Sequence, residues 1–223
     1  MISLSSHVIV PVMVFLNNRL LKGNRNFFRL FLANLYFKEQ LVFKIKPVLI
    51  KYHVSDPDVL PENLFVWAGD WDKRLITIDK HEKIIMVREL FLENKDYRET
   101  AFYSFAVNRM KENRPVKRGV IMLDSPVNID RYFEKHKKIF YEIKNQGFDI
   151  NRSSKIGVAI GRDGKLIHFR EGHHTLAIAK ILGINEIKIK IRAVHSEWLF
   201  NQLSGSKLDI LSTIKNSLNK LFQ

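Results

Sequence analysis

Residues 186 to 194 alternate strictly between apolar and polar side chains, and this alternation constrains the fold more than any other feature of the sequence. On an extended chain one face would carry Ile187, Ile189, Ile191 and Ala193, and the other Lys188, Lys190 and Arg192. A period of two residues is typical of a strand with one buried and one exposed face. The segment therefore predicts a half-buried strand.

The residues before this strand have the pattern of a hairpin followed by a helix. Residues 156–160 form a short apolar run, residues 161–164 an Asp-Gly turn and residues 165–169 a second short strand. Residues 173–182 have helical composition and end at Gly183. Further helical patterns cover residues 79–93, 99–113 and 128–145. We therefore expect an α/β fold of the α+β type, with a small mixed sheet around residues 156–194.

Changes in composition divide the chain into four segments. Residues 1–46 hold seven basic residues and one acidic residue, and apolar spacing between Arg19 and Phe37 predicts a basic amphipathic helix. Such a helix can lie in a membrane interface or pack on the core with a solvated basic face. A mainly helical region is expected at residues 47–154, a core at 155–205 and an amphipathic helix at 206–223.

The net charge of +14 and the lack of cysteine bound the function. A chain without cysteine has no disulfides, no thiolate nucleophile and no cysteine-ligated metal, which suits a reducing compartment such as the cytoplasm. No apolar run approaches the roughly 20 residues of a membrane span. The positive charge favours phosphate-bearing partners: nucleotides, nucleic acid or an anionic membrane surface. We expect a cytoplasmic protein that can be peripheral to the membrane.

The predicted turn from strand to helix at residues 170–175 has the chemistry of a phosphate site. Gly172 allows a ligand to approach the backbone, and the N–H groups at the start of a helix favour an anion. His173 and His174 follow directly, and histidines there can donate to phosphate oxygens or exchange a proton near neutral pH. In the alternative interpretation, one histidine caps the helix and the other lies on a polar surface.

The run from Ile167 to Gly183, with the strand that follows, resembles the core motif of the ParB/sulfiredoxin superfamily. The resemblance implies a mixed sheet of that type and a nucleotide (ATP, ADP or CTP with Mg²⁺) held at Gly172, His173 and His174. His173 stands where sulfiredoxins place their cysteine, which excludes sulfinic acid reduction. Thr175 stands where most members place a phosphate-binding arginine, so Arg170, Arg162 or Lys180 would have to supply the charge.

A second candidate motif is Gly69-Asp70-Trp71-Asp72, which resembles a motif upstream of the core in one subgroup of the same superfamily. Asp70 and Asp72 could bind a divalent cation, or Asp70 could act as a base towards a hydroxyl acceptor. Alternatively, the two carboxylates cap a turn that Trp67 and Trp71 anchor to the core.

Three functions follow from these features. The first is a nucleotide-dependent phosphotransferase that acts on a small molecule or a glycan- or lipid-linked precursor, with Glu171 or Asp70 as base and His173 at the phosphates. The second is a nucleic-acid-binding protein of the ParB type, which the basic strand face favours, although the residues after Val194 are too few for a further DNA-reading domain. The third is a non-catalytic scaffold on a membrane surface, in which the motif has lost its activity. Thr175 favours this function because it stands where most members of the superfamily have an arginine.

Overall fold

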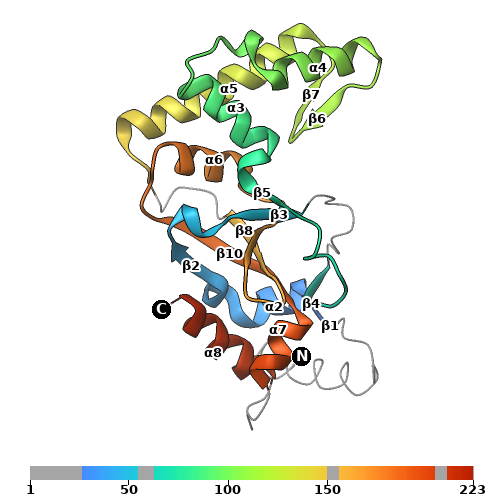
Figure 1. Ribbon diagram of the computed structural model, residues 1–223, viewed down its shortest axis with the longest axis vertical. Helices are drawn as coiled ribbons and strands as arrows, with labels where there is room; N and C mark the ends of the chain where they lie inside the picture. The colour runs from blue at the N-terminus through green and yellow to red at the C-terminus, as the bar shows by residue number, and fades with distance from the viewer. Residues whose placement is uncertain (1–26, 55–62, 150–155, 204–209, 223) are drawn as a thin grey trace, which may run out of the picture. The chain divides into compact units, whose positions relative to one another are not determined.

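The structure, a computed structural model, describes residues 27–54, 63–149, 156–203 and 210–222 (Figure 1). Within these ranges it contains seven α-helices and ten β-strands, which confirms the predicted mixed α/β class. Contacts between Cα atoms divide the chain into two compact units. The sheet unit comprises Met1–Ile78, Lys155–Glu171 and Glu186–Gln223, and the helical unit comprises Asp79–Ser154 and Gly172–Asn185.

The sheet unit contains an eight-stranded mixed sheet. Its strands are β1 (Phe27–Arg29), β2 (Val42–Ile45), β3 (Tyr52–Val54), β4 (Leu64–Trp67), β5 (Leu75–Thr77), β8 (Ile156–Ile160), β9 (Leu166–His168) and β10 (Ile187–His195). They run in the order β1-β4-β10-β8-β9-β3-β5, and β2 also pairs with β10. The pairs β10–β4, β10–β8 and β3–β9 are parallel, and the other pairs are antiparallel. The sheet is therefore larger than predicted, because residues 27–77 supply five of its strands.

Strand β10 lies inside this sheet and pairs with more strands than any other described strand does. It pairs with β8, β4 and β2, and its apolar face is fully buried at Ile187, Ile189 and Ile191. Each such isoleucine contributes roughly 1.5–3 kcal/mol to folding. The basic residues of the opposite face are only half-buried. From Ala193 onward every residue of the strand is buried, so the strand's end is covered on both faces.

The predicted hairpin of residues 156–169 is confirmed as the antiparallel pair β8–β9. All five residues of β8 are buried, as expected of an apolar strand inside a sheet. Gly157 has to be glycine, because a Cβ there would overlap the carbonyl oxygen of Phe169. That close approach continues the backbone hydrogen bonding beyond the end of β9: Phe169 N–H donates to the carbonyl of Gly157, and Gly157 N–H donates to the carbonyl of Glu171.

Three helices complete the sheet unit: α2 (Leu30–Phe37), α7 (Ser196–Leu203) and α8 (Ile210–Phe222). The described part of the predicted tail helix, α8, is confirmed, and it buries Leu211, Ile214 and Leu218 at helical spacing. None of the described helices is both long enough and apolar enough to cross a bilayer.

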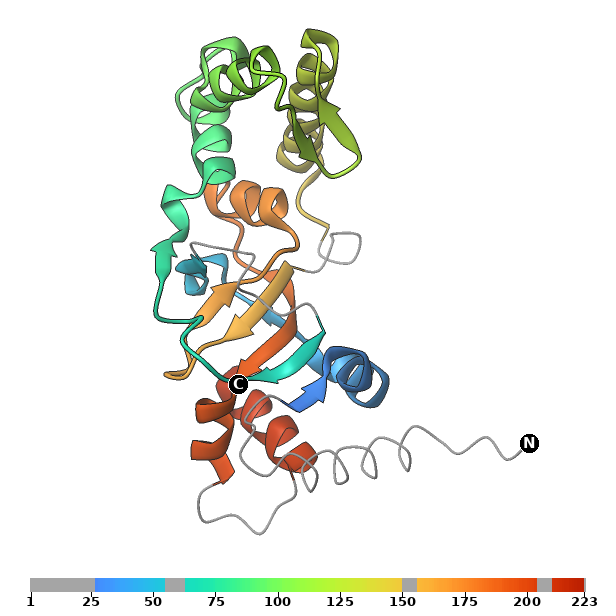
Figure 2. The same ribbon diagram turned by 90° about the vertical axis from the view of Figure 1, so that its right-hand side faces the viewer.

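The helical unit contains α3 (Glu82–Phe91), α4 (Ala101–Lys111), α5 (Pro126–Gln146), α6 (His173–Ile181) and the hairpin β6 (Val116–Arg118) and β7 (Ile121–Leu123). The hairpin lies beside α5 (Figure 2). All four predicted helices are confirmed within a few residues. Local caps fix two of the starts, since Thr100 Oγ1 accepts from Tyr103 N at 3.2 Å and Ser125 Oγ from Asn128 N at 3.3 Å.

The predicted basic amphipathic helix from Arg19 to Phe37 is confirmed as a helix at residues 30–37 and is wrong at residues 27–29, which form β1 and pair with β4. This short helix contains no charged residue, so it has no basic face, and Phe31 is 66% exposed. Strand pairing with a distant segment overrides the local helical spacing here. The rest of that prediction, the apolar run of residues 8–16 and the turn expected at Ser55–Asp58 lie outside the described residues.

The predicted segment boundaries also differ from the two units. The region 47–154, expected to be mainly helical, begins with three strands that belong to the sheet unit. The core expected at residues 155–205 is shared, because α6 packs with α3 in the helical unit. The chain passes from the sheet unit to the helical unit between Glu171 and Gly172, in the middle of the candidate motif.

Candidate functional site

Helix α6 begins where the sequence predicted a phosphate site. Gly172 is its N-cap and adopts a left-handed conformation (φ 79°), which glycine tolerates without strain, and it makes no side-chain cap. The first bond of the helix runs from Leu176 N to Gly172 O at 2.9 Å, so His173, His174 and Thr175 form the first turn. The N–H groups of a helix's first turn carry partial positive charge.

The N-terminus of a second helix lies against the first. His81 is the N-cap of α3, and its Nδ1 accepts a hydrogen bond from Lys83 N at 3.2 Å. The His81 ring lies 4.7 Å from the His173 ring, centroid to centroid. The N-termini of α3 and α6, both with partial positive charge, therefore lie next to each other in the helical unit. Nothing in the sequence marked His81, since it is 92 positions from its neighbour in the motif.

Two cationic side chains, Lys83 and Arg118, lie near these helix ends together with one carboxylate, Glu82. Arg118 Nη2 donates to both oxygens of Glu82, at 2.8 and 3.0 Å. Lys83 is half-buried, and among the described residues no carboxylate forms an ion pair with its ammonium group. Burial, and then the charge of Arg118, lower the pKa of Lys83, while Glu82 opposes them. We call His81, Lys83, Arg118 and His173 the basic N-terminal cluster.

His174 takes part in a separate buried group. Its Nε2 lies 2.9 Å from the Tyr132 hydroxyl, and its ring stacks on that of His136 at 3.7 Å. Burial lowers the pKa of His174 to about 2 and that of His136 to about 4, and nearby positive charges add to both shifts. Both rings are therefore neutral at pH 7. One nitrogen of His174 is occupied by Tyr132, so this residue positions the start of α6 and adds no charge.

The residues just before α6 belong to the sheet unit and are paired there. The Glu171 carboxylate forms an ion pair with Arg192, and the main-chain oxygen of Glu171 bonds to the His168 ring at 2.9 Å. Arg170 has a left-handed backbone (φ 57°), which is uncommon for a residue with a side chain. The ion pair with Arg192 occupies the Glu171 carboxylate, so Glu171 is poorly placed for the catalytic role predicted for it.

The Gly-Asp-Trp-Asp motif is a turn locked by Arg162. The rings of Trp67 and Trp71 are buried and stacked 4.9 Å apart. The Asp72 side chain is 3% exposed. Its carboxylate accepts hydrogen bonds from three atoms of Arg162: the backbone N (2.7 Å), Nε (3.0 Å) and Nη2 (2.7 Å). Arg162 Nη2 also donates to Asp70 Oδ1 at 3.0 Å. This is the geometry of the alternative interpretation, an Asp-rich turn anchored by tryptophans.

The same pairing bears on the predicted metal ligands and on Arg162 as a phosphate ligand. Both carboxylates of the expected Mg²⁺ pair bind a guanidinium, and hydrogen bonds from Lys73 and then from Arg162 lower the pKa of Asp70. Within the described ranges no group of three His, Asp or Glu residues could hold a metal ion. The donor set at Asp70 and Asp72 therefore does not fit Mg²⁺, and the Arg162 guanidinium is already engaged by carboxylates.

Comparison of the chain with protein-family models, with curated proteins and with solved structures found no match.

The structure thus sorts the predicted site residues into two groups. Asp70, Asp72 and Arg162 come together in the sheet unit, where Glu171 also lies. A second set begins α6 in the helical unit, namely Gly172, His173, His174 and Thr175. The residues that sequence reasoning missed are His81, Lys83 and Arg118, which reach the second group by packing of α3 and the β6–β7 hairpin.

Proposed function

We propose that the protein binds a nucleotide through its phosphate groups at the basic N-terminal cluster. The observation that carries the proposal is Lys83, a half-buried ammonium group with no described ion-pair partner, beside a second cation and two helix N-termini. A charge without a partner is costly to bury. A phosphate supplied from solution would provide the missing counter-charge.

The arrangement suits a multiply charged anion. Arg118 and Lys83 together carry two positive charges, and Glu82 neutralises one of them. At an effective dielectric constant of about 20, one phosphate charge about 4 Å from an ammonium group gains about 4 kcal/mol. His173 and Thr175 can add polar hydrogen bonds at the α6 end of the site. The surplus charge is therefore sufficient for binding without the family arginine that Thr175 replaces.

Phosphoryl transfer to a small hydroxyl or to a glycan- or lipid-linked acceptor is the activity that we propose for a bound triphosphate. Of the three predicted catalytic residues, Glu171 and Asp70 are paired with guanidinium groups, which leaves His173 as the base. Magnesium would then reach the site on the nucleotide, because the described residues offer no cluster for it. The absence of cysteine agrees with a cytoplasmic location, where such nucleotides are abundant.

A nucleic-acid-binding role is less well supported. The basic face of β10 was its main support, yet that strand is central in the sheet and Arg192 pairs with Glu171. An exposed, unpaired row of cations is what phosphate backbones require.

Calorimetric titration with ATP, ADP and CTP in the presence of Mg²⁺ tests the proposal. We expect the wild type to bind at least one of them, and Lys83→Met to bind it at least tenfold more weakly, about 1.4 kcal/mol. Lys111→Met removes an exposed lysine at the end of α4 and is the matched control, expected to leave affinity unchanged. A wild type that binds none of the three nucleotides would falsify the proposal. Salt-sensitive binding of a DNA oligonucleotide instead would favour the nucleic-acid role.

A further inference from the structure

The β6–β7 hairpin presents an apolar residue at its tip. Gly119 (φ 61°) and Val120 form the tight two-residue turn, and Val120 is 90% exposed. Turns of this kind are usually polar at their tips. Met122 on β7 and Val127 at the start of α5 are also exposed, at 39% and 74%. An aliphatic edge of this kind points to a binding surface when it adjoins a cavity.

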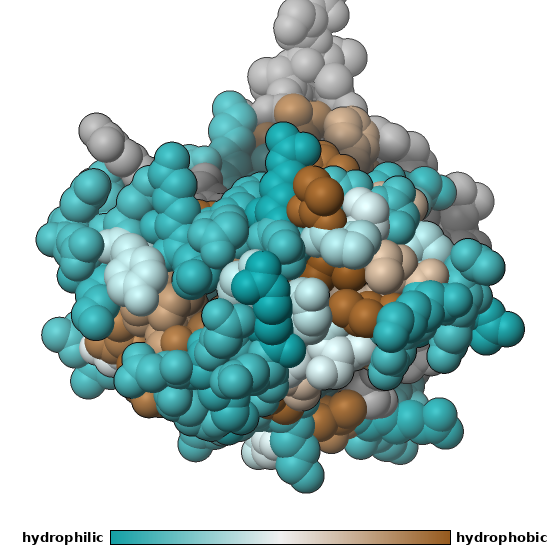
Figure 3. Space-filling model, turned by 90° about the horizontal axis from the view of Figure 1, so that it is seen from above, coloured by the Kyte–Doolittle hydropathy of each residue, from teal (hydrophilic) through white to brown (hydrophobic). Residues whose placement is uncertain are grey.

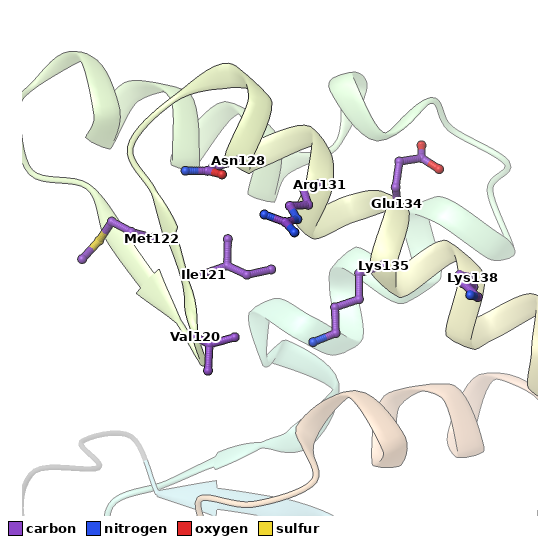
Figure 4. A pocket seen from close by; sticks show the side chains of 8 residues that line it. All are labelled: Val120, Ile121, Met122, Asn128, Arg131, Glu134, Lys135 and Lys138. Carbon is purple, nitrogen blue, oxygen red and sulfur yellow. The ribbon is translucent and has the colours of Figure 1, made fainter.

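Such a cavity lies between the hairpin and α5. It measures about 920 Å³ and is lined by Val120, Ile121, Met122, Asn128, Arg131, Glu134, Lys135 and Lys138 (Figure 4). This volume is within the range of small-molecule sites, about 300–1,000 Å³. The hairpin forms an aliphatic wall, and the Arg131 guanidinium extends from α5 towards it. The surface of the helical unit, seen from the side of α4 and α5, is mainly hydrophilic with separate apolar patches (Figure 3).

The α5 wall of the pocket is basic. Arg131, Lys135 and Lys138 recur at spacings of four and three residues, which places them on one face of the helix. Arg131 and Lys135 are exposed, and no carboxylate among the described residues forms an ion pair with either. The one acidic lining residue, Glu134, pairs with Lys137 at 3.4 Å, outside the lining, and points away from the hairpin (Figure 4).

The composition of the lining selects among anionic ligands. Nucleobases are held mainly by aromatic stacking, and the lining contains no aromatic side chain. An inorganic anion would use the cations but leave the aliphatic wall exposed. A ligand with an anionic head and an aliphatic chain satisfies both walls at once, since the head meets α5 and the chain meets the hairpin.

We propose that this pocket binds an anionic phospholipid, with its phosphate at Arg131 and Lys135 and its acyl chain against Val120 and Met122. The proposal does not depend on nucleotide binding, because the pocket shares no lining residue with the basic N-terminal cluster. It also does not involve the N-terminal segment, for which the sequence suggested membrane contact.

The test uses the full chain and short-chain lipids that remain monomeric. Titration with dihexanoyl phosphatidic acid should give saturable binding, and dihexanoyl phosphatidylcholine and inorganic phosphate should bind at least tenfold more weakly. Lys135→Gln and Val120→Ser should each weaken the binding of phosphatidic acid about fivefold, the effect expected of one surface cation or one small buried side chain. Lys144→Gln, on α5 but outside the lining, is the matched control and should have no effect.

Each other outcome overturns the proposal. Equal binding of phosphate and phosphatidic acid would mean a simple anion site, and the same affinity in all variants would mean a site elsewhere. Tight binding of a single-stranded RNA oligonucleotide or an acidic peptide without lipid binding would identify a different partner. All three substituted positions are exposed, so unchanged melting temperatures should verify folding. Lys83→Met should weaken nucleotide binding at least tenfold and leave lipid binding intact, which separates failure of one proposal from failure of the other.

Discussion

Lys83→Met should make the protein more stable while it weakens nucleotide binding. The Lys83 ammonium group is half-buried beside Arg118 without a described ion-pair partner, so folding desolvates a charge and gains little from it. Leaving such a group unsatisfied costs about 1–3 kcal/mol. Methionine keeps the unbranched stem and its packing, and it forfeits only the weak attraction of Glu82, under about 1 kcal/mol.

The net gain in the free energy of unfolding should be about 1–2 kcal/mol. For a chain of 150–250 residues, each kcal/mol raises the melting temperature by about 2–4 °C. The gain should shrink as the pH rises through the lowered pKa of Lys83, because the wild-type amine is then neutral and folding no longer opposes it. Urea unfolding at pH 7 and at increasing pH measures this, with Lys111→Met expected to stay within about 0.5 kcal/mol of the wild type.

Two results would refute the reasoning. If Lys83→Met destabilises the protein, the ammonium group has a stabilising partner in the protein and does not need a bound anion as its counter-charge. If the variant is more stable yet binds nucleotide as the wild type does, Lys83 is a tolerated buried lysine and the phosphates bind elsewhere. Residues that lower stability in the free protein are expected where a ligand supplies the missing interaction.

Three further outcomes follow from the structure. His136 and His174 have pKa values of about 4 and about 2 in the fold against an ordinary 6.5, so the unfolded chain binds more protons below pH 6.5. Stability should therefore fall by up to about 2.7 kcal/mol per pH unit as the pH drops from about 6 to 4, and urea titrations should show a flatter dependence in His136→Phe. Asp72→Asn should lower the free energy of unfolding by about 3–5 kcal/mol because it breaks a buried ion pair with Arg162. Asp70→Asn should lower it by under about 1 kcal/mol because the Asp70 side chain is 69% exposed. Equal losses of stability in thermal unfolding would contradict this difference. Gly157→Ala should destabilise by about 1–3 kcal/mol or more through overlap with a carbonyl oxygen, and a wild-type melting temperature would show that the strand can shift.

Much of the fold could be predicted from the sequence in segments where the local pattern and the burial agree. The alternation of β10, the Asp-Gly hairpin and the helices α3 to α6 were predicted because a single period or cap signal defines each. The strands of residues 27–77 were missed because they are short, three or four residues each, and take their conformation from distant partners. Over residues 30–37 the apolar spacing suggested a helix with a basic face, but the charged residues lie outside the helix that forms.

The site could be predicted only on the α6 side. The helical composition of residues 173–182 and the closing Gly183 predicted α6, so the place of Gly172 and the histidines at its start was correct. Their neighbours come from contacts over long separations, such as His81 with His173 and Tyr132 with His174, and no local pattern encodes these. For the same reason the pairing of Arg162 with Asp72 could not be foreseen, although each residue had been singled out.

The central position of β10 has a consequence for synthesis on the ribosome. Strands β2, β4 and β8 all pair with a segment that emerges only after residue 186, so until then each of them lacks one of its partners. Contacts between such distant segments make folding slow, and unpaired strand edges promote aggregation in the meantime. The helices α4 and α5 contact each other and the β6–β7 hairpin between them and can fold earlier, whereas α3 contacts mainly the later helix α6. We therefore expect the nascent chain to carry a structured helical part and an unfinished sheet until the translation of β10, the period in which a chaperone would protect it most.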